Sequence, residues 1–355
     1  MYILLDKDLT PIDHIDAYDS AIWAERHREY GDFELYGRPQ SLIGKGVSTG
    51  RFLARQGSDT VMFIENVRID TDVDEGPFAT ITGRSLESML KRRILWPPVS
   101  VSGKVPAVIR QLLESTVIRP SDSRRRIPNF IMREPSNDYI SEIEMSAQFS
   151  GETVYDAIVA ICEVHDLGFK IVVDDGAFVF VLYKGTDRSF NQDTNPYVIF
   201  SPDFDNLASS SYSHTTDTMT TFAYVAGEES DDSSRLTAEV DLGTTGLDRV
   251  ELFVDAGDIR STDEDGNEYT QEEYGSFLEE RGLESLSENS ATEFFEGSMD
   301  THGTFIYGRD FFLGDTVQIK NEFDMTAASQ VLEIVYTKDS TGETIVPTFA
   351  TPILN

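Results

Sequence analysis

The sequence predicts a β-rich α+β fold in which one β module occurs twice. Short runs of alternating apolar and polar residues cover much of the chain, as is typical of half-buried strands. Strong helical periodicity is confined to a few stretches. Two hairpin-like segments of the same kind stand far apart: Phe63–Gly83 reads FIENVRIDTDVDEGPFATITG, and Val331–Thr351 reads VLEIVYTKDSTGETIVPTFAT.

The two segments share a pattern more than a sequence. Aligned on their first residues they are 268 positions apart (331 − 63), so that Glu65 meets Glu333 and Val67 meets Val335. Each has an apolar-rich strand, an acidic turn with glycine, and a second strand that contains a proline. This pattern predicts a module that is used twice.

Residues 1–98 are predicted to be mostly β. In AIWAERHREYGDFELYG, the alternation places Phe33 and Leu35 on one face of a strand. The segment RSLESMLKRRIL then has helical spacing, with Ser85 as its N-cap. Trp96–Pro98 ends this first unit.

Residues 99–200 are predicted to form a separate α/β unit. Helices are expected in KVPAVIRQLLEST and in ETVYDAIVAICEVHDLG, the second ending with Gly168 at its C-terminal cap. Cys162 lies in the apolar run of that helix, which indicates a small core residue. Asp175-Gly176 is the usual two-residue signal for the hairpin that follows.

The remaining chain is predicted to be a second β module, split into residues 201–258 and 295–355. Residues 259–294 are the expected helical insertion. Its helix is predicted to start at Thr270, because the Thr270 hydroxyl and Glu273 fit a capping box.

The chain is strongly acidic, with 29 basic and 63 acidic residues in 355 and a net charge of −34. Residues 1–200 carry −8 (22 basic, 30 acidic) and residues 201–355 carry −26 (7 basic, 33 acidic). A phosphate-binding protein needs a basic patch, so this charge argues against nucleic acid as the main partner. Only 8 of the cations are Lys. We favour a halophilic protein, whose like charges are screened by molar salt, over an acidic protein from ordinary salt with a solvated face.

The single cysteine excludes an internal disulfide framework and a cysteine-rich zinc site. The N-terminal MYILLDKDLTPIDHID lacks the basic region and long apolar stretch of a signal peptide. No run approaches the 18 apolar residues of a membrane-spanning helix.

Two motifs have a catalytic or metal-binding form. GVSTG, Gly46–Gly50, matches the hydrolase pattern around Ser48, but its neighbours favour a turn between two strands. Ser261–Glu272 partly matches a calcium loop, with Ser261 where the first ligand should be aspartate. A turn followed by a helix cap explains it better. The residues that do match the loop are Asp263, Asp265, Gly266 and Glu272.

No other pattern indicates chemistry. With 63 acids, a catalytic carboxylate pair cannot be singled out, and there is no phosphate-binding glycine motif. His165, at the end of a helix, has a structural role. The basic run Arg124–Arg126 either docks an acidic neighbour or anion or is a solvated loop. The histidines show no metal spacing: His14, His27, His165, His214 and His302. We therefore expect no catalytic, cofactor-binding or metal residue, and a structural or binding protein.

Five stretches, in matching order, resemble the tail-hub proteins of siphoviruses, which are similar to the baseplate hub of contractile phages. The first contains the pair Ile22-Trp23 ahead of a Gly-x-Phe-Glu-Leu strand. The five are AIWAERHREYGDFELYG around Gly31–Leu35, Ile81–Leu95, Tyr269–Asn289, Tyr307–Ile319, and IVPTFA near the end.

The resemblance implies two similar β-barrel tube domains, one split by an insertion, and a peripheral α/β domain. A homotrimer would then present six tube-like domains. It would join the six-fold tail tube to the three-fold tip at the distal end of the virion tail, with DNA passing through its channel. Strands 61–69 and 331–337 are the expected ring contacts. Because the chain stops at Asn355, just past the second module, we expect a hub without its own enzyme.

The implied partners are the tail tube or distal tail protein, the tape-measure protein, and tail fibre or tip proteins, without specific nucleic-acid binding. The acidity suggests a tailed virus of a halophilic archaeon. Two alternatives stay open: a tail-associated hydrolase of the cell envelope that uses Ser48 or a carboxylate, and a receptor-binding adhesin whose binding unit is residues 99–200.

Overall fold

The fold is β-rich α+β, as the sequence predicts. The computed structural model describes residues 1–204, 206–207, 209–230, 233–263, 266–298, 304–321, 323 and 326–353, without the side chains of 209–210, 291–298 and 351–353. Asp265 and His302, singled out above, lie outside the described residues.

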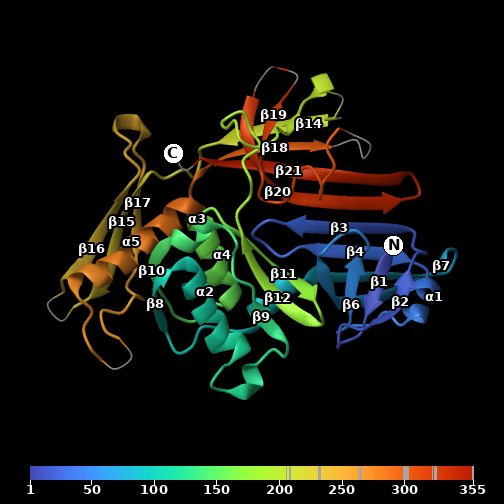
Figure 1. The fold of residues 1–355 in the computed structure, drawn as a ribbon, viewed down its shortest axis with the longest axis horizontal. Helices are drawn as coiled ribbons and strands as arrows, with labels where there is room; N and C mark the ends of the chain where they lie inside the picture. The colour runs from blue at the N-terminus through green and yellow to red at the C-terminus, as the bar shows by residue number, and fades with distance from the viewer. Residues whose placement is uncertain are drawn as a thin grey trace.

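One sheet of 13 strands runs through the molecule (Figure 1). Its strands follow the order β14-β18-β21-β20-β3-β4-β7-β6-β5-β1-β2; in addition, β19 pairs with β20, and β13 pairs with β19. Their bounds are β1 Tyr2–Leu5, β2 Pro11–Ile15, β3 Ser20–Arg26, β4 Asp32–Gly37, β5 Phe52–Arg55, β6 Val61–Asp72, β7 Gly76–Ser85, β13 Ile199–Phe200, β14 Ser209–Thr215, β18 Ala291–Ser298, β19 Thr316–Lys320, β20 Thr326–Asp339 and β21 Gly342–Ile353.

Two groups of strands in this sheet have the same order and the same connections. The first β module, β3-β4-β7-β6 with β5, corresponds strand by strand to the second β module, β14-β18-β21-β20 with β19. Both long hairpins carry a bulge, between Ile64 and Asn66 in β6 and between Val331 and Glu333 in β20. Matching the bulges aligns Asn66 with Glu333, an offset of 267. The repeated hairpin is confirmed, but the sequence alignment was one residue out of register: it matched Phe63 with Val331, whereas Ile64 and Val331 are the residues that directly precede the two bulges.

The expected pair of closed barrels is not found among the described strands. Strand β20 of the second module pairs antiparallel with β3 of the first, from Glu333↔Arg26 to Lys338↔Ala21. The sheet therefore continues from one module into the next. Both modules share one core, in which Trp23, Phe33 and Phe349 are almost fully buried. Phe33 and Leu35 share its inner face, as their alternation predicts.

Residues 86–183 form an α/β unit, whose apolar core also includes Leu5, Phe52, Val61 and Phe63 from β1, β5 and β6. Cys162 is fully buried in it, as expected. Asp175 and Gly176 both have positive φ (47° and 72°), as the turn signal predicts. The elements are η2 Leu86–Arg92, β8 Val99–Lys104, α2 Val105–Leu113, η3 Glu114–Ile118, η4 Ser123–Arg125, β9 Phe130–Met132, α3 Asp138–Glu142, β10 Glu144–Phe149, α4 Val154–Val164, β11 Gly168–Asp174 and β12 Ala177–Tyr183.

Of two predicted helix caps in this region, one is correct in position and one is wrong. Ser85 is the N-cap residue of η2, as predicted, but its side chain makes no capping bond; its hydroxyl instead accepts a hydrogen bond from the Gly31 amide at 2.7 Å. Gly168 is not the cap of α4, which is His165; instead Gly168 begins β11. In both cases the residue that the local sequence assigns to a helix end makes a contact with a distant part of the chain instead of a capping bond.

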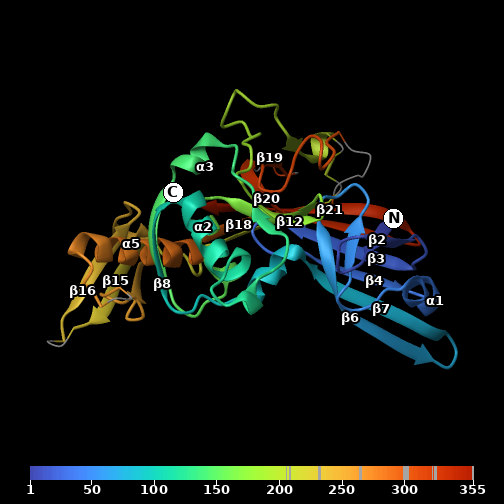
Figure 2. The ribbon, with the colours of Figure 1, turned by 60° about the horizontal axis from the view of Figure 1, so that its bottom comes forward.

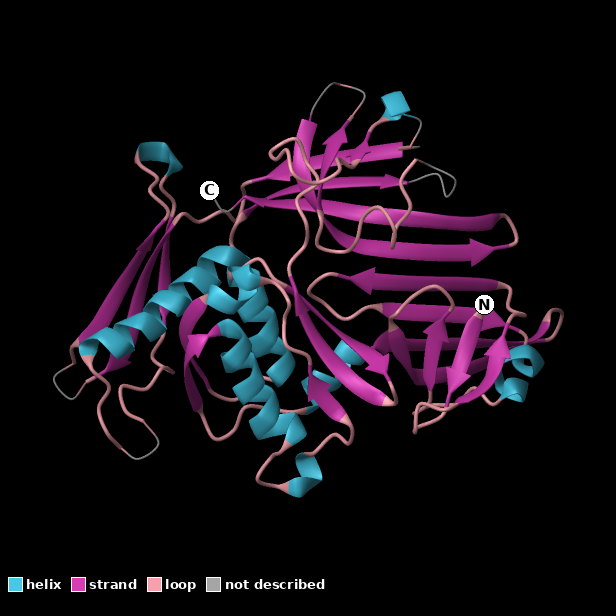
Figure 3. Ribbon diagram, viewed as in Figure 1, coloured by secondary structure: helices cyan, strands magenta, loops and turns pink. Residues whose placement is uncertain are grey.

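A further unit, which we define as residues 217–290 and call the insertion unit, leaves the sheet between β14 and β18. Figure 3 shows helix α5 lying across a three-stranded sheet of order β16-β15-β17. The predicted capping box of Thr270 and Glu273 is confirmed. The bounds are β15 Phe222–Glu229, β16 Arg235–Asp241, η6 Gly246–Asp248, β17 Glu251–Asp255 and α5 Gln271–Glu288; elsewhere the chain has α1 Pro39–Leu42, η1 Ile43–Lys45 and η5 Pro202–Phe204.

Candidate assembly interface

The pairing of β20 with β3 is the central junction of the molecule. Arg26 is half-buried there, and its guanidinium donates to Glu333 Oε1 at 2.7 Å and to Asp32 Oδ2 at 2.6 Å. Burial alone would lower the pKa of Arg26, but the hydrogen bonds and charges of these two carboxylates raise it. The ion pair with Glu333 therefore joins two strands across a separation of 307 residues in sequence.

Glu25, the neighbouring residue on β3, is only 4% exposed. It accepts hydrogen bonds from Trp23 Nε1 at 2.9 Å, from Ser58 Oγ at 2.6 Å and from the Tyr307 hydroxyl at 3.2 Å. Arg55 lies 3.8 Å away and stacks on the Tyr336 ring. A buried carboxylate needs such partners. The carboxylate oxygens of Glu25 therefore link both modules by accepting these hydrogen bonds.

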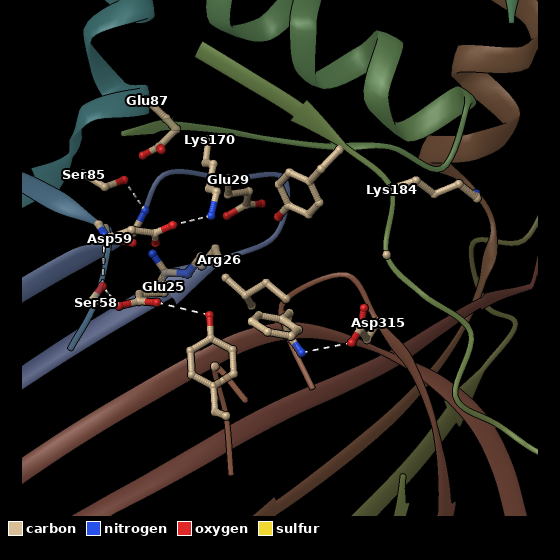
Figure 4. A pocket seen from close by; sticks show the side chains of 18 of the residues that line it. Glu25, Arg26, Glu29, Ser58, Asp59, Ser85, Glu87, Lys170, Lys184 and Asp315 are labelled. Carbon is tan, nitrogen blue, oxygen red and sulfur yellow. Dashed lines mark hydrogen bonds and ion pairs between the residues drawn. The ribbon is translucent and has the colours of Figure 1, made fainter. Parts of the chain in front are cut away.

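A cavity of about 500 Å³ lies beside this junction (Figure 4). Its charged lining is largely paired: Lys170 Nζ contacts Asp59 Oδ2 at 2.5 Å, and the buried Glu87 accepts the Ile171 amide at 2.7 Å. Burial raises the pKa of Glu87. The cavity is thus a polar seam between the first β module, the α/β unit and the second β module, with its charges held by structural partners.

His27, just after β3, joins three units. Its amide donates to the Leu332 carbonyl at 2.8 Å, and its Nδ1 lies 3.0 Å from the Tyr183 hydroxyl. The imidazole is 1% exposed and is enclosed by Gly168 and Gly314, where an added Cβ would come within 2.4 Å of the ring. Burial, together with the nearby Arg28, lowers the pKa of His27 to about 3. The ring is therefore neutral at ordinary pH.

The two modules together form a row of eight strands, β14-β18-β21-β20-β3-β4-β7-β6. At each end of this row one strand edge is open, and the two open edges are equivalent to the edges of β20 and β3 that meet at the junction. Strand β5 pairs with β6 only at residues 61–63, so the outer edge of residues 66–72 has no partner strand among the described residues. On the other side, β14 pairs only with β18 in the described part of the chain. Figure 2 shows the β6–β7 hairpin extending away from the body.

Side-chain burial distinguishes the used edge from the open one. Tyr336 on β20 is 9% exposed, whereas its counterpart in the first module, Ile69, is 53% exposed. The expected ring strand 331–337 is therefore already occupied by β3 of the same chain. Of the expected strand 61–69, only the part after the bulge is open.

The predicted chemical motifs do not come together. Gly46–Gly50 forms a turn before β5 with Ser48 exposed, although a 3₁₀ helix precedes it instead of a strand. The described part of Ser261–Glu272 folds as a turn in which Asp263 accepts bonds from Asn267, followed by the cap. His165 ends α4 as expected, and its Nε2 also lies 3.4 Å from Glu280.

The other histidines are not close to one another: His14 is exposed beside Asp13, and His214 lies exposed on β14. The described part of the chain contains no group of three or more potential metal ligands. Nor does any of its helices combine the length and apolar character needed to cross a membrane.

The sequence alone does not identify Glu25, Arg26 or His27 as junction residues. One signal is present: the apolar run Ala21–Ala24 is followed directly by Glu25 and Arg26, which end the strand, and by His27. Polar groups inside a buried strand require partners, but the sequence does not say which ones.

The family model described as "Siphovirus ReqiPepy6 Gp37-like protein" matches residues 1–350. The chain belongs to this family of siphovirus tail proteins. The Gp37-like chain is therefore a structural protein of the virion tail. No curated protein matches its sequence.

Three solved tail proteins are similar in fold to this Gp37-like chain, each at 12% sequence identity. The 43 kDa tail protein of prophage MuSo2 from Shewanella oneidensis has a TM-score of 0.60 and covers 99% of both chains. The tail protein from Neisseria meningitidis MC58 has a TM-score of 0.57, with 99% and 96% covered. Prophage tail protein gp18 from Listeria monocytogenes EGD-e has a TM-score of 0.56, with 98% and 94% covered.

We predict that Gly168→Ala destabilises the Gp37-like chain by about 1–3 kcal/mol, a typical cost of overpacking a core. The new Cβ would lie 2.4 Å from the His27 ring and 2.6 Å from Tyr183. Urea unfolding measures the change. Gly275→Ala is the matched control: no atom lies within 4 Å of its Cβ position in α5, so it should be neutral or stabilising. Equal unfolding midpoints for Gly168→Ala and the unchanged chain would contradict this packing.

We also predict a pH dependence that comes from His27. Because its pKa is about 3 in the folded chain and about 6.5 when unfolded, the unfolded state binds the proton first as pH falls. The contribution of His27 to the free energy of unfolding is complete above pH 6.5. Between pH 6.5 and 3 it is lost by up to about 1.4 kcal/mol per pH unit. We expect the free energy of unfolding, measured with urea at pH 5 to 8, to depend less steeply on pH for His27→Gln than for the unchanged chain, because all other titrating groups are shared. Identical slopes would show that His27 is protonated equally in both states.

Proposed function

We propose that three copies of the chain form a closed ring of six β modules, a tail hub that joins the six-fold tail tube to the three-fold tip at the distal end of the virion. The observation that carries this proposal is the β20–β3 junction: it joins the last strand of one module to the first strand of the next. The two equivalent edges remain open on β6 and β14, at the two ends of the row β14-β18-β21-β20-β3-β4-β7-β6. A head-to-tail contact of this kind forms a ring if its rotation closes.

The repeat gives the register of the proposed contact between chains. Inside the chain, Val335 pairs with Ala24. By the bulge alignment, Val335 corresponds to Arg68. By the strand pairing within each module, where Trp23 faces Phe33 and Tyr212 faces Phe295, Ala24 corresponds to Ser213. We therefore infer that Arg68 of one copy lies opposite Ser213 of the next.

In this proposal the ring acts by position and shape, as a channel for DNA, and performs no catalysis. Its neighbours are the tail tube or distal tail protein, the tape-measure protein, and fibre or tip proteins. Its net charge of −34 per chain would repel passing DNA and so prevent it from sticking to the wall. The halophilic archaeal host stays a prediction from composition.

A disulfide between copies tests the register. In a Cys162→Ser background, Arg68→Cys with Ser213→Cys should give covalent dimers and trimers on mild oxidation, and nothing larger, because a ring of three closes on itself. The control pair is Thr71→Cys with Thr215→Cys, which the same register places five residues out of step. Covalent species larger than a trimer would refute the closed ring of three. Equal cross-linking by both cysteine pairs would refute the register.

A charged residue on the open edge should weaken assembly without unfolding the chain. Ile69→Asp places a carboxylate where Tyr336, its counterpart, is buried, so that association should fall roughly 10- to 100-fold, the effect of losing one buried apolar side chain. Val73→Asp, at a fully exposed position at the hairpin tip, is the control. Sedimentation velocity measures association and urea unfolding measures stability. Unchanged association of Ile69→Asp would exclude β6 from the interface.

A further inference from the structure

Basic residues are concentrated on a surface of the α/β unit. It is formed by two short segments, 91–93 and 119–126, which hold seven of the 29 cations and a single acid, Asp122. They lie side by side, because Arg93 Nε donates to the Arg125 carbonyl at 2.6 Å and the Arg125 guanidinium donates to the Ile94 carbonyl at 2.5 Å. We call this surface the arginine patch: Lys91, Arg92, Arg93, Arg119, Arg124, Arg125 and Arg126.

Much of this charge is not neutralised within the chain. No ion pair to an acidic side chain is found for Arg93, Arg125 or Arg126 among the described residues. Burial and then the charges of Arg125 and Arg92 lower the pKa of Arg93. Next to the patch, Ile94 and Trp96 are 50% and 61% exposed. Arginine and tryptophan side by side at a surface are typical of the energetically important part of a protein–protein contact.

The insertion unit has the opposite charge. Residues 217–290 contain 21 acidic and 4 basic side chains, a net −17, which is half of the chain's −34 in about a fifth of its length. Asp217, Asp241, Glu251 and Glu288 are all exposed there. A patch of arginines is most complementary to a surface of this kind.

The internal junction indicates where these surfaces meet. The insertion unit leaves the sheet just after Thr215, and the proposed register places Thr215 opposite Asn66 of the neighbouring copy. The arginine patch adjoins β6 at this point, since Arg92 lies 3.7 Å from Glu65 and stacks on Phe63. In Figure 1 the segment that follows α2 lies at the lower edge of the molecule, away from the chain's own β14 and β18.

At the equivalent point inside the chain, the contact is made to the α/β unit that follows the same module. The loop that leaves the first module at the equivalent point, residues 27–31, packs on the α/β unit. There Arg28 donates to the Leu167 carbonyl at 2.9 Å and to Asp166 Oδ1 at 2.5 Å. In the neighbouring copy the equivalent exit is occupied by the whole insertion unit.

We infer that the arginine patch of one copy docks the acidic insertion unit of the next copy around the ring. This inference rests on the proposed ring, and adds a second, electrostatic contact to the strand pairing. Its occupant is a second copy of this chain, because the open edge of β6 brings that copy's acidic unit to the patch.

Charge reversal in the full-length chain tests the contact. Arg119→Glu with Arg126→Glu should reduce association at least 10-fold in 0.2 M salt, and less in 3 M salt, where charges are screened. Arg119 and Arg126 are both exposed. Adding Asp217→Lys and Glu288→Lys to the same chain should restore association, because the pair of charges is then exchanged. The matched control is Arg110→Glu with Arg133→Glu, two arginines of the same unit outside the patch, which should leave association within about 2-fold.

The disulfide pair of Arg68→Cys and Ser213→Cys, measured in each variant, separates this inference from the ring itself. If the unchanged chain forms covalent trimers but the patch reversal associates as well as the control, the docking is refuted and the ring stands. If reversal weakens association but the lysine pair does not restore it, the insertion unit is not the occupant. If no cross-link forms in any variant, the ring is refuted, and the docking with it.

Discussion

The fold depends on one pairing, that of β20 with β3. It brings the end of the chain to its beginning and makes a single sheet out of two modules that could otherwise fold apart. The pairing is specified by buried or half-buried polar groups that find their partners in it: Arg26 lies between Glu333 and Asp32, Glu25 accepts from three donors, and His27 lies between two glycines. Because a one-residue slip would expose the whole buried face of a strand, these contacts hold the register as well as the position.

The same pairing explains why the open edges of the two modules differ from the edges that meet between them. Natural proteins blunt an open strand edge with charge, bulges or short strands. Here β6 carries a bulge at Glu65 and polar residues at its tip, yet keeps Ile69 half-exposed at the position where its counterpart Tyr336 is buried. An open edge with an apolar residue at this position is suited to contact with another strand. The contact inside the chain is the template for the contact that we propose between copies.

Local features were readable from the sequence, and long-range features were not. The alternation of Phe33 and Leu35, the capping box at Thr270 and the Asp175-Gly176 turn depend on residues near them in the chain, and all three predictions hold. Gly168 failed as a helix cap because its lack of a side chain is needed by His27, a residue 141 positions earlier (168 − 27). The β20–β3 junction has no local signature, because strand partners are chosen by burial over the whole fold.

The charge distribution sets a further condition on any assembly of this chain. Copies that each carry −34 repel one another, and salt screens that repulsion only beyond the Debye length, about 8 Å at 0.15 M and about 3 Å at 1 M. A close contact therefore has to be locally neutral or attractive wherever it is dense. Most arginines here are paired within the chain, such as Arg84 with Glu65 and Arg281 with Asp258. Cations left without such partners beside an open strand edge are the groups able to offset the repulsion, and the arginine patch is where this chain concentrates them.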